Sequence, residues 1–382
     1  MGIKDLFKIL SVKHTDVLKN TNISDFQNKY IAIDILTFIY KFIRSSGEER
    51  WINQLLLMFY KLQKNNIKII CIFDGKNYPI EKRNEHQIRA LNIKKIEEKY
   101  IKILELKEKV KNDMVKNVNL IENINLLNNI ITKRNKSFIV TPESITYLNL
   151  LRNIKDVELK LYKQCIKITY KHIELVKEMM NSMNIKYLIA DGEAEKLCSY
   201  LCFKGIVDAV LSEDSDVIAY ETPTFISKIN LKDDSMIVIN YKNILNATNM
   251  TNKQFKDFCI LCGCDYNSRI KIKSKNYKKD SGIGSIKAYK LIKDYGTIEN
   301  IEKNTGFDIT PLNYISCREI FSFLEYDNIF SLKDVIFDDI NTNKLEIFLD
   351  KHNVKININM WKKIENDNIY KKVLKQTEDL NI

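Results

Sequence analysis

Short apolar runs rich in β-branched residues recur along the first two-thirds of the chain and predict buried strands. They are KYIAIDI (29–35), IKIICIFDG (67–75), IKYLIA (185–190) and VDAVLSED (207–214), with SMIVINYK (235–242) as a further candidate. Helical patterns lie between them, at 36–63, 80–182 and 193–205. Alternating strands and helices predict an α/β fold with a parallel sheet and helices on both of its faces. After residue 250 the pattern is mainly helical, with one irregular basic loop at 267–280.

Residues 92–134 form a Lys-, Glu- and Asn-rich helical stretch without Gly or Pro. Apolar residues recur in it at helical spacing: Ile96, Tyr100, Ile103, Leu106, Val110 and Met114. The pattern fits an ordinary amphipathic helix with a solvated charged face, and it fits equally a helical arch that stands over an active site.

The amino-acid composition limits which kinds of protein this chain can be. The 382 residues are 45% apolar, enough for one large α/β domain with an attached module or for two domains. The net charge of +12 fits a polyanionic partner such as nucleic acid or an anionic membrane. No segment approaches the roughly 18–20 apolar residues of a membrane span, and the N-terminus MGIKDLFKIL has no signal-peptide core, so we expect an intracellular protein. The eight cysteines lack disulfide or zinc spacing and fall in apolar runs, which favours buried thiols.

Acidic residues follow four of the predicted strands. They are Asp34, Asp74, Glu193, Glu195, Asp214 and Asp216, and Asp265 in LCGCDY is a seventh candidate. The carboxyl ends of parallel strands meet at one edge of a sheet, where ligands bind, so we expect these side chains to gather there. Taken singly, each acid could be a turn residue, a helix cap or a partner of a helix dipole.

As a set, the acids predict a metal centre. So many like charges are tolerable together only when cations neutralise them, and hard oxygen ligands select Mg²⁺ or Mn²⁺. Two such ions about 3.5–4 Å apart would activate a water and stabilise the leaving oxygen of a phosphoryl group. Because the chain as a whole is basic, we expect the substrate to be a phosphodiester.

Several stretches together resemble the flap endonucleases, members of the XPG-type family of structure-specific 5′ nucleases. They are MGIKDLFKIL, IAIDILTFIYKF, CIFDGK, YLIADGEAEKLCSYL, VLSEDSDVIAY, FCILCGCDYN and GIGSIKAYKLI, in family order over residues 1–300. The resemblance implies an N-terminal nuclease region (1–91), a helical arch or insertion (92–165), an internal nuclease region (166–250) and a C-terminal helical region with a helix–two-turn–helix (251–382).

The resemblance also implies roles for the acids. Asp34, Asp74, Glu193 and Glu195 would hold a first Mg²⁺, and Asp214, Asp216 and Asp265 a second, with Mn²⁺ as a substitute. Gly2 matches a glycine that packs near the active site, and Tyr40 an aromatic residue on which the base at the junction stacks, although plain core packing would also explain Tyr40.

A Lys and an Arg seven residues apart would face the scissile phosphate and stabilise the charge of the transition state. Lys82 and Arg89 have that spacing and would share a helix face, with Arg83 as the alternative to Lys82.

The stretch SGIGSIKAYKLIKDYG (281–296) resembles the helix–two-turn–helix of the family. Gly282 and Gly284 would let backbone amides approach a phosphate, Lys287 and Lys290 would add contacts, and a K⁺ ion would bridge the loop and the duplex.

The chain departs from the family in three places. The segment from Asp74 to Glu193 is longer than usual, and the tail LKQTEDLNI has Gln376 but no aromatic pair, which argues against docking to a sliding clamp. The third departure is a basic insertion at 267–280, for which we expect extra phosphate contacts, a solvated loop being the alternative. Its basic residues are Arg269, Lys271, Lys273, Lys275, Lys278 and Lys279.

The sequence therefore predicts a Mg²⁺-dependent 5′ nuclease, a monomer that cuts 5′ flaps and branched or nicked DNA in replication, repair or recombination. A 5′ exonuclease or Holliday-junction resolvase of the same family stays open, as does a non-catalytic DNA-binding scaffold. A nucleus and a viral replication compartment are both compatible with the sequence.

Overall fold

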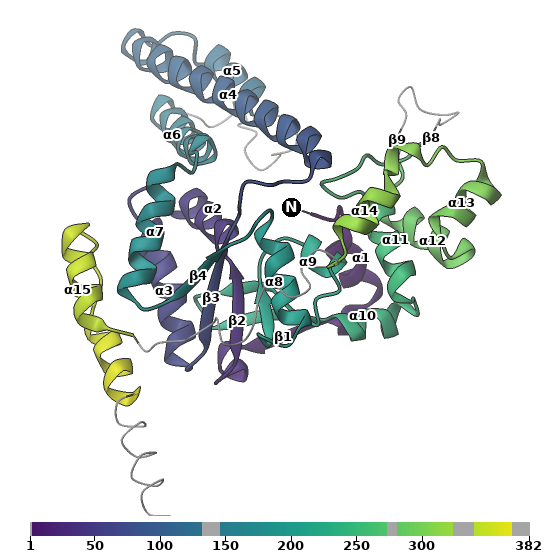
Figure 1. Cartoon of the computed structure of the whole chain (residues 1–382). Coiled ribbons are helices and arrows are strands. Elements are labelled where there is room, and N and C mark those ends of the chain that lie inside the picture. The colour runs from purple at the N-terminus through teal and green to yellow at the C-terminus, as the bar shows by residue number, and fades with distance from the viewer. Residues whose placement is uncertain (1, 132–145, 273–280, 324–339, 369–382) are drawn as a thin grey trace, which may run out of the picture. The chain divides into compact units, whose positions relative to one another are not determined.

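The computed structural model describes residues 2–131, 146–272, 281–323 and 340–368 (Figure 1). The chain divides into two compact units. The first, which we call the sheet unit, comprises Met1–Phe42, Glu49–Arg83 and Thr169–Ile382. The second, the helical unit, comprises Ile43–Glu48 and Asn84–Ile168.

A seven-stranded sheet forms the centre of the sheet unit, with the strand order β1-β7-β6-β5-β2-β3-β4. The strands from β6 through β5, β2 and β3 to β4 are parallel to one another, whereas β7 is antiparallel to both β6 and β1. The strands are β1 Leu18–Asn22, β2 Tyr30–Asp34, β3 Lys68–Phe73, β4 Lys186–Ile189, β5 Ala209–Leu211, β6 Thr224–Asn230 and β7 Ser235–Asn240.

The five strands predicted from apolar runs are all present, and the mainly parallel sheet is confirmed. The sequence pattern did not reveal β1 and β6, which are part of the same sheet. The segment of β1, LKNTN, is polar and half exposed because it lies at the sheet edge, so it lacks the apolar run that marks the inner strands.

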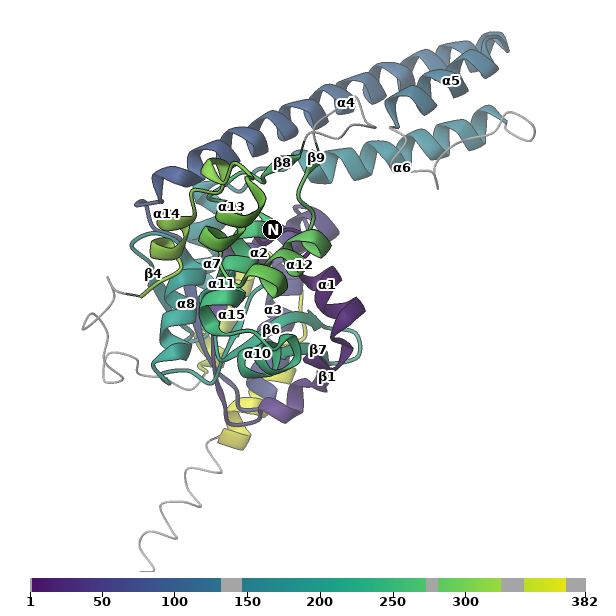
Figure 2. The same cartoon turned by 90° about the vertical axis from the view of Figure 1, so that its right-hand side faces the viewer.

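Helices make up most of the rest of the sheet unit (Figures 1 and 2). They are α1 Leu6–Lys13, α2 Ile35–Ser46, α3 Trp51–Lys64, α7 Tyr170–Ser182, α8 Ala194–Phe203, α9 Asp216–Ala219, α10 Tyr241–Thr248, α11 Asn252–Cys262, α12 Ser285–Tyr295, α13 Ile298–Thr305, α14 Tyr314–Ile320 and α15 Thr342–Lys351. Short 3₁₀ turns are η1 Thr15–Val17, η2 Ile23–Phe26, η3 Ile80–Lys82 and η6 Thr310–Leu312, and a two-stranded ladder joins β8 Lys271–Ile272 to β9 Ser281–Gly282. Within the described ranges, no helix is both long and apolar enough to cross a membrane.

Both faces of the sheet are buried. Ala32 and Val210 point toward the core that α8 contributes to, and their neighbours Ile31 and Leu211, which point the other way, are also fully buried. Because each strand must be apolar on both sides, the inner strands appear in the sequence as continuous apolar runs.

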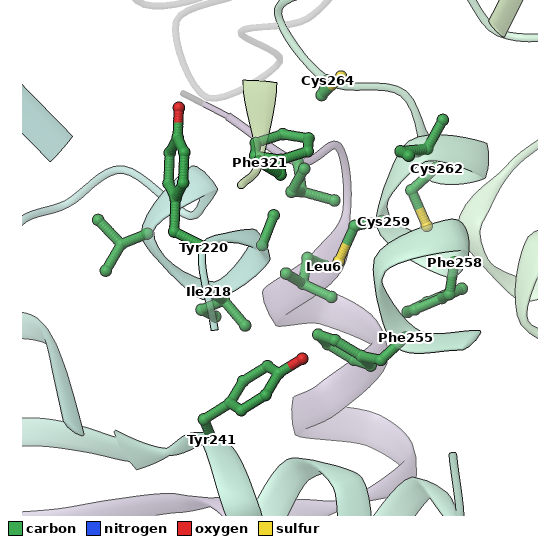
Figure 3. Close-up of a cluster of buried hydrophobic side chains, with 14 of the residues drawn as sticks. Leu6, Ile218, Tyr220, Tyr241, Phe255, Phe258, Cys259, Cys262, Cys264 and Phe321 are labelled. Atoms are coloured by element: carbon green, nitrogen blue, oxygen red, sulfur yellow. The ribbon is translucent and has the colours of Figure 1, made fainter. Parts of the chain in front are cut away.

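A buried cluster joins the sheet to the C-terminal helices (Figure 3). Leu6 of α1, Ile218 of α9 and the α11 residues Phe255 and Phe258 pack together in it with Phe321. The cluster also holds Cys259, Cys262 and Cys264, and seven of the eight cysteines are buried as the sequence pattern predicted. This packing fixes the start of α9 and the end of α11, the two places from which Asp216 and Asp265 project.

The helical unit has a core of its own. Its helices are α4 Arg83–Lys116, the first residue of which belongs to the sheet unit, α5 Leu120–Ile130 and α6 Tyr147–Cys165. Their core consists of Ile103, Leu106, Val110, Ile124, Leu127, Leu150, Ile154 and Val157. Of the six apolar residues noted at helical spacing, Ile103, Leu106 and Val110 are buried there, whereas Met114 is exposed. The amphipathic pattern therefore reflects helix–helix packing inside this unit.

One ion-pair network ties α11, α13 and α14 together. The fully buried carboxylate of Asp257 accepts hydrogen bonds from Nε of Arg318 at 2.7 Å and Nη2 at 2.6 Å. Nη1 of Arg318 also donates to Glu299 at 2.6 Å, and the backbone amide of Ile298 donates to Asp257 at 3.3 Å.

We predict that Arg318→Gln lowers the free energy of unfolding by about 3–5 kcal/mol, because Asp257 would keep a buried charge without its partner. Urea denaturation followed by circular dichroism measures this. Arg152→Gln, on the exposed face of α6, is the control and should change stability by less than about 0.5 kcal/mol. Equal stabilities of the two variants would show that the network does not hold the three helices together.

Candidate active site

The acids predicted at strand ends do lie at one edge of the sheet. Asp34 is the last residue of β2, and Asp74 follows β3 directly. The parallel registers pair Ile33 with Leu211 of β5, and Phe73 with Ile189 of β4. The loops that carry Asp214 and Glu193 therefore leave the sheet at the same edge, where the order of the strands reverses between β2 and β5.

Two of the acids are fixed by local hydrogen bonds. Oδ2 of Asp34 accepts a hydrogen bond from the hydroxyl of Ser212 at 2.9 Å. Oδ1 of Asp74 accepts one from the backbone amide of Ala194 at 2.8 Å, at the first turn of α8. This hydrogen bond places Asp74 at the N-terminus of α8, the end of a helix that carries a partial positive charge.

Gly2 lies against Asp214 and Asp216. A Cβ atom on Gly2 would approach Oδ1 of Asp214 to 2.1 Å and Oδ1 of Asp216 to 2.8 Å, and the φ of Gly2 is 77°. Both the space and the backbone conformation therefore require glycine at this position. The approach of the N-terminal chain to these carboxylates depends on the absence of a side chain.

Lys82 is buried among the carboxylates, with 7% of its surface exposed. Its ammonium group donates to Oε1 of Glu193 and lies 3.6 Å from Oε1 of Glu195 and 3.9 Å from Oδ2 of Asp265. The other carboxylate oxygen of Glu193 accepts a hydrogen bond from the hydroxyl of Tyr266. Lys82 is thus the cation that these three acids share in this structure.

The carboxylates are not arranged around a metal ion in this structure, but their chemistry suits one. Among the described residues, no three His, Cys, Asp or Glu side chains are arranged closely enough to hold a metal ion as they stand, and Lys82 contacts three of the carboxylates instead. Asp216, however, is fully buried, and both of its carboxylate oxygens lack a hydrogen-bond partner among the described residues. A buried carboxylate without partners is costly, and an all-oxygen donor set suits a hard divalent cation. By chemistry, the residues fit such an ion.

Burial and the charges of neighbouring groups shift the pKa values of the acids. Burial raises the pKa of Asp34 and of Asp216 well above the ordinary value, and the charges of Glu195 and Asp214 respectively add to this. Burial also raises the pKa of Glu195, which the charge of Lys82 opposes, and raises that of Asp214 to about 6. Burial lowers the pKa of Lys82, but the surrounding carboxylates, Glu195 first, outweigh burial and raise it.

Of the two basic residues considered after Asp74, Lys82 points into the cluster and Arg83 is exposed. The expectation that Lys82 and Arg89 share the face of one helix is wrong, because Lys82 ends the 3₁₀ turn η3 and α4 begins at Arg83. Arg89 lies in the helical unit and donates to Glu85 at 3.1 Å.

Tyr40, on α2 after Asp34, has 37% of its surface exposed, so it is not a plain core residue.

The candidate DNA-binding residues differ in their surroundings. Gly284 is the N-cap of α12, and a Cβ there would meet no described atom within 4 Å, so there is open space beside this residue. Lys287 and Lys290 are exposed on α12. Arg269 instead donates to the carbonyl of Cys262 at 2.6 Å and to Asp5 at 3.1 Å, and Gly282 packs on its side chain. Lys273, Lys275, Lys278 and Lys279 lie outside the described residues, and Lys271 is described by its backbone alone.

Sequence reasoning missed three residues at this site. Ser212 and Tyr266 are hydrogen-bond partners of Asp34 and Glu193, and Tyr78 donates its hydroxyl to Oδ2 of Asp74 at 3.2 Å. Ser212 and Tyr266 each lie within two residues of a predicted acid, in LSED and CDY. That proximity was the available signal, but a hydroxyl next to an acid is too common to single out without a structure.

Comparison with known proteins agrees with this geometry. The family model for the XPG N-terminal domain matches residues 1–96, and the model for the XPG I-region matches residues 184–265. The probable RAD2-like endonuclease 076L of Invertebrate iridescent virus 3 is 30% identical over 345 residues, which cover 84% of this chain and 85% of that protein. Flap endonuclease 1 of Candida tropicalis is 27% identical over 343 residues, covering 84% of this chain and 76% of that protein.

A solved structure of the catalytic core of Rad2 in complex with DNA substrate has the same fold. Its TM-score is 0.60 at 15% identity, over 95% of this chain and 98% of that chain.

The fold, the acidic edge of the sheet and these relatives define a nuclease. The chain belongs to the XPG-type flap endonuclease family.

We predict that Lys82→Met destabilises the protein in a metal-free buffer by about 3–5 kcal/mol, because Glu193 and Glu195 lose their shared cation. Added Mn²⁺ should raise the melting temperature of the variant more than that of the wild type, since the ion no longer competes with an ammonium group. Thermal melts with EDTA and with a Mn²⁺ series measure both effects. Lys19→Met, on the exposed edge strand β1, is the control. A Mn²⁺ response identical to the wild type would mean that Lys82 and the ion do not compete.

We predict that Asp214→Asn stabilises the metal-free protein at pH 7.5 by up to about 2–3 kcal/mol. The pKa of Asp214 is about 6 in the folded protein, above that of an unfolded chain. Its contribution to stability is therefore complete below about pH 4 and is lost as the pH rises through about 6. The advantage of the variant should disappear at low pH. Melting curves from pH 4 to 8 in EDTA measure this, with the exposed Asp16→Asn as control; an advantage independent of pH would contradict it.

Proposed function

We propose that this protein is a structure-specific 5′ nuclease that hydrolyses one phosphodiester bond near the base of a 5′ flap, with two divalent ions, Mg²⁺ in the cell, bound to the carboxylates. The observation that carries the proposal is the carboxylate of Asp216, buried beside Asp214 and without a hydrogen-bond partner among the residues that the structure describes. It lies at the edge of the sheet where Asp34, Asp74 and Glu195 also lie. Buried carboxylates in this number indicate a site for cations.

The bound ions would supply an activated water and neutralise charge on the leaving oxygen. Asp34, Asp74, Glu193 and Glu195 are proposed to hold one ion, and Asp214, Asp216 and Asp265 the other. Mn²⁺ would serve in place of Mg²⁺, because it prefers the same oxygen ligands.

The basic, aromatic and glycine residues of the site would contact the DNA or shape the site. Lys82 would stabilise negative charge on the phosphate once a metal ion replaces it among the carboxylates. Arg89 and the exposed Arg83 are the further basic candidates of this segment. Tyr40 would stack with the base at the junction, which its exposure allows. Gly2 keeps the N-terminal chain in contact with Asp214 without blocking it.

Duplex DNA would bind at the start of α12. The helix N-terminus at Gly284, which has open space beside it, and the exposed Lys287 and Lys290 suit the phosphate backbone, and a K⁺ ion at the preceding turn would add a contact. Arg269 contributes less in this proposal than its sequence suggested, because Cys262 and Asp5 already bind its guanidinium. The insertion that contains Lys273 and Lys275 stays a candidate for further phosphate contacts.

The helical unit is our candidate for the arch that selects a single-stranded 5′ end. We further propose that the protein acts as a monomer in DNA replication, repair or recombination. Recruitment through a C-terminal clamp motif is not part of the proposal, because the segment around Gln376 has no aromatic pair.

The decisive experiment is cleavage of a 5′-labelled double-flap DNA by the wild type and by Asp216→Asn. With Mg²⁺, we expect the wild type to cut near the base of the flap. The variant should be at least about 100-fold slower, because a ligand of the metal is lost. Asp16→Asn, an exposed acid outside the cluster, should keep full activity.

The same experiment separates the alternatives. A 3′ flap, a four-way junction and a blunt duplex are included as further substrates. Symmetric nicking of the four-way junction would make the protein a resolvase, and stepwise loss of nucleotides from a 5′ end would make it an exonuclease. Binding of DNA without a cut, with either Mg²⁺ or Mn²⁺, would contradict the enzymatic function and leave a DNA-binding scaffold.

A further inference from the structure

The N-terminal segment that precedes α1 contacts the loop that carries Asp214 and Asp216. Gly2 packs so closely on these two acids that a Cβ atom on it would overlap with Oδ1 of each. The carbonyl of the next residue, Ile3, accepts a hydrogen bond from the hydroxyl of Ser215 at 3.3 Å. Because Ser215 stands between the two acids in the sequence, this bond fastens the segment to the part of the loop from which they project.

The same segment also contacts the loop that carries Asp265. The amide of Lys4 donates to the carbonyl of Gly263 at 3.0 Å, and the carboxylate of Asp5 accepts a hydrogen bond from Nη2 of Arg269 at 3.1 Å. Gly263 and Arg269 stand on either side of Asp265 in the sequence. The N-terminal segment therefore connects the two loops from which the proposed ligands of the second metal ion project.

Arg269 is held by the end of α11 as well as by Asp5. Its Nε donates to the carbonyl of Cys262, the last residue of α11, at 2.6 Å. A cation is favourable there, because the last carbonyls of a helix carry partial negative charge. The stem of the side chain lies against two glycines. A Cβ on Gly263 would approach Cγ of Arg269 to 2.9 Å, and one on Gly282 would approach its Cβ to 3.0 Å.

These contacts need an arginine. The planar guanidinium carries donors that point in different directions, so one side chain reaches both the carbonyl of Cys262 and the carboxylate of Asp5. A phosphate contact needs a cation that turns toward the DNA. The Arg269 side chain is only 24% exposed, and its guanidinium already has a carbonyl and a carboxylate as partners.

We propose that Arg269 is a positioning residue and not a phosphate contact. By binding Asp5 to the end of α11, it keeps the N-terminal segment where Asp214, Asp216 and Asp265 bind a divalent cation. This inference rests on the proposed function and gives a new role to a residue whose sequence suggested DNA binding. Partners that orient the ligands of a metal ion contribute to its affinity without touching the ion.

Binding of Mn²⁺ without DNA tests the positioning role. Arg269→Gln removes the charge that Asp5 and α11 share, so we expect its affinity for Mn²⁺, measured by calorimetry, to fall about tenfold. Asp5→Asn should also lower the affinity. The double variant should bind Mn²⁺ as Arg269→Gln does, because both changes break the same ion pair. Lys19→Gln, on the exposed edge strand β1, is the control and should bind Mn²⁺ as the wild type does.

The salt dependence of DNA binding separates positioning from a phosphate contact. Each phosphate contact contributes about 0.9 to the slope of log K against log salt concentration. We expect Arg269→Gln to bind a blunt duplex in EDTA with the slope of the wild type. Lys290→Gln, on the exposed face of α12, is the matched variant and should lower the slope by about one.

The outcomes are distinct. Wild-type affinity for Mn²⁺ in both Arg269→Gln and Asp5→Asn would overturn the inference alone. A slope lowered by about one in Arg269→Gln would make this residue a phosphate contact and overturn the inference too. If the wild type itself binds no Mn²⁺, the proposed function fails and the inference fails with it. Melting curves in EDTA reveal any misfolding of Arg269→Gln, and Asp5→Asn, at a side chain that is 50% exposed, then decides.

Discussion

The site is built around the burial of several carboxylates at one edge of a sheet. Asp34, Glu195, Asp214 and Asp216 are nearly inaccessible to water, and burial raises the pKa of each. Such an arrangement costs free energy, because each acid loses hydration and repels its neighbours. The fold must therefore hold the acids together against their repulsion. A sheet with both faces buried does this, since its strands cannot move apart without exposing the core.

Lys82 is buried in the carboxylate cluster and balances part of its negative charge. Its ammonium group contacts Glu193, Glu195 and Asp265, yet it leaves both oxygens of Asp216 without a partner among the described residues. A single ammonium is compact and carries one charge, so it cannot balance a cluster of this size. A divalent ion that entered the cluster would compete with Lys82 for the same oxygens. In the function we propose, ion binding and the position of Lys82 would therefore be coupled, and the lysine would become available to a phosphate when a cation took its place.

The sequence allowed the five apolar strands and the acids at their ends to be predicted, because both leave strong local patterns. A buried parallel strand is a continuous apolar run, and the change to Asp34 or Asp214 marks its carboxyl end. The polar edge strand β1 gave no such pattern, and its pairing with β7 depends on contacts far apart in the chain. The position of Lys82 inside the cluster also escaped prediction. The helical spacing to Arg89 suggested one helix face directed at the scissile phosphate, whereas a short 3₁₀ turn before α4 places Lys82 among the carboxylates. Tyr78 was missed because nothing in its local sequence distinguishes a tyrosine that touches Asp74 from one in an ordinary turn.

The chain consists of two units with separate cores, and the carboxylates belong to only one of them. The carboxylates, Lys82, Tyr40 and Tyr78 all belong to the sheet unit, whereas α4, α5 and α6 bury Ile103, Ile124 and Ile154 in a core of their own. Substitutions at sites that share no partners affect stability independently, so we expect repacking inside the core of the helical unit to be tolerated separately from changes in the core of the sheet unit. The long segment between Asp74 and Glu193 is then compatible with an intact site. Since both ends of this segment adjoin the cluster, through η3 on one side and α8 on the other, the sheet unit needs only to keep these two anchors in place. Backbone hydrogen bonds from the amides of Gly75–Asn77 to the carbonyls of Asp191 and Gly192 hold the two ends of the segment together.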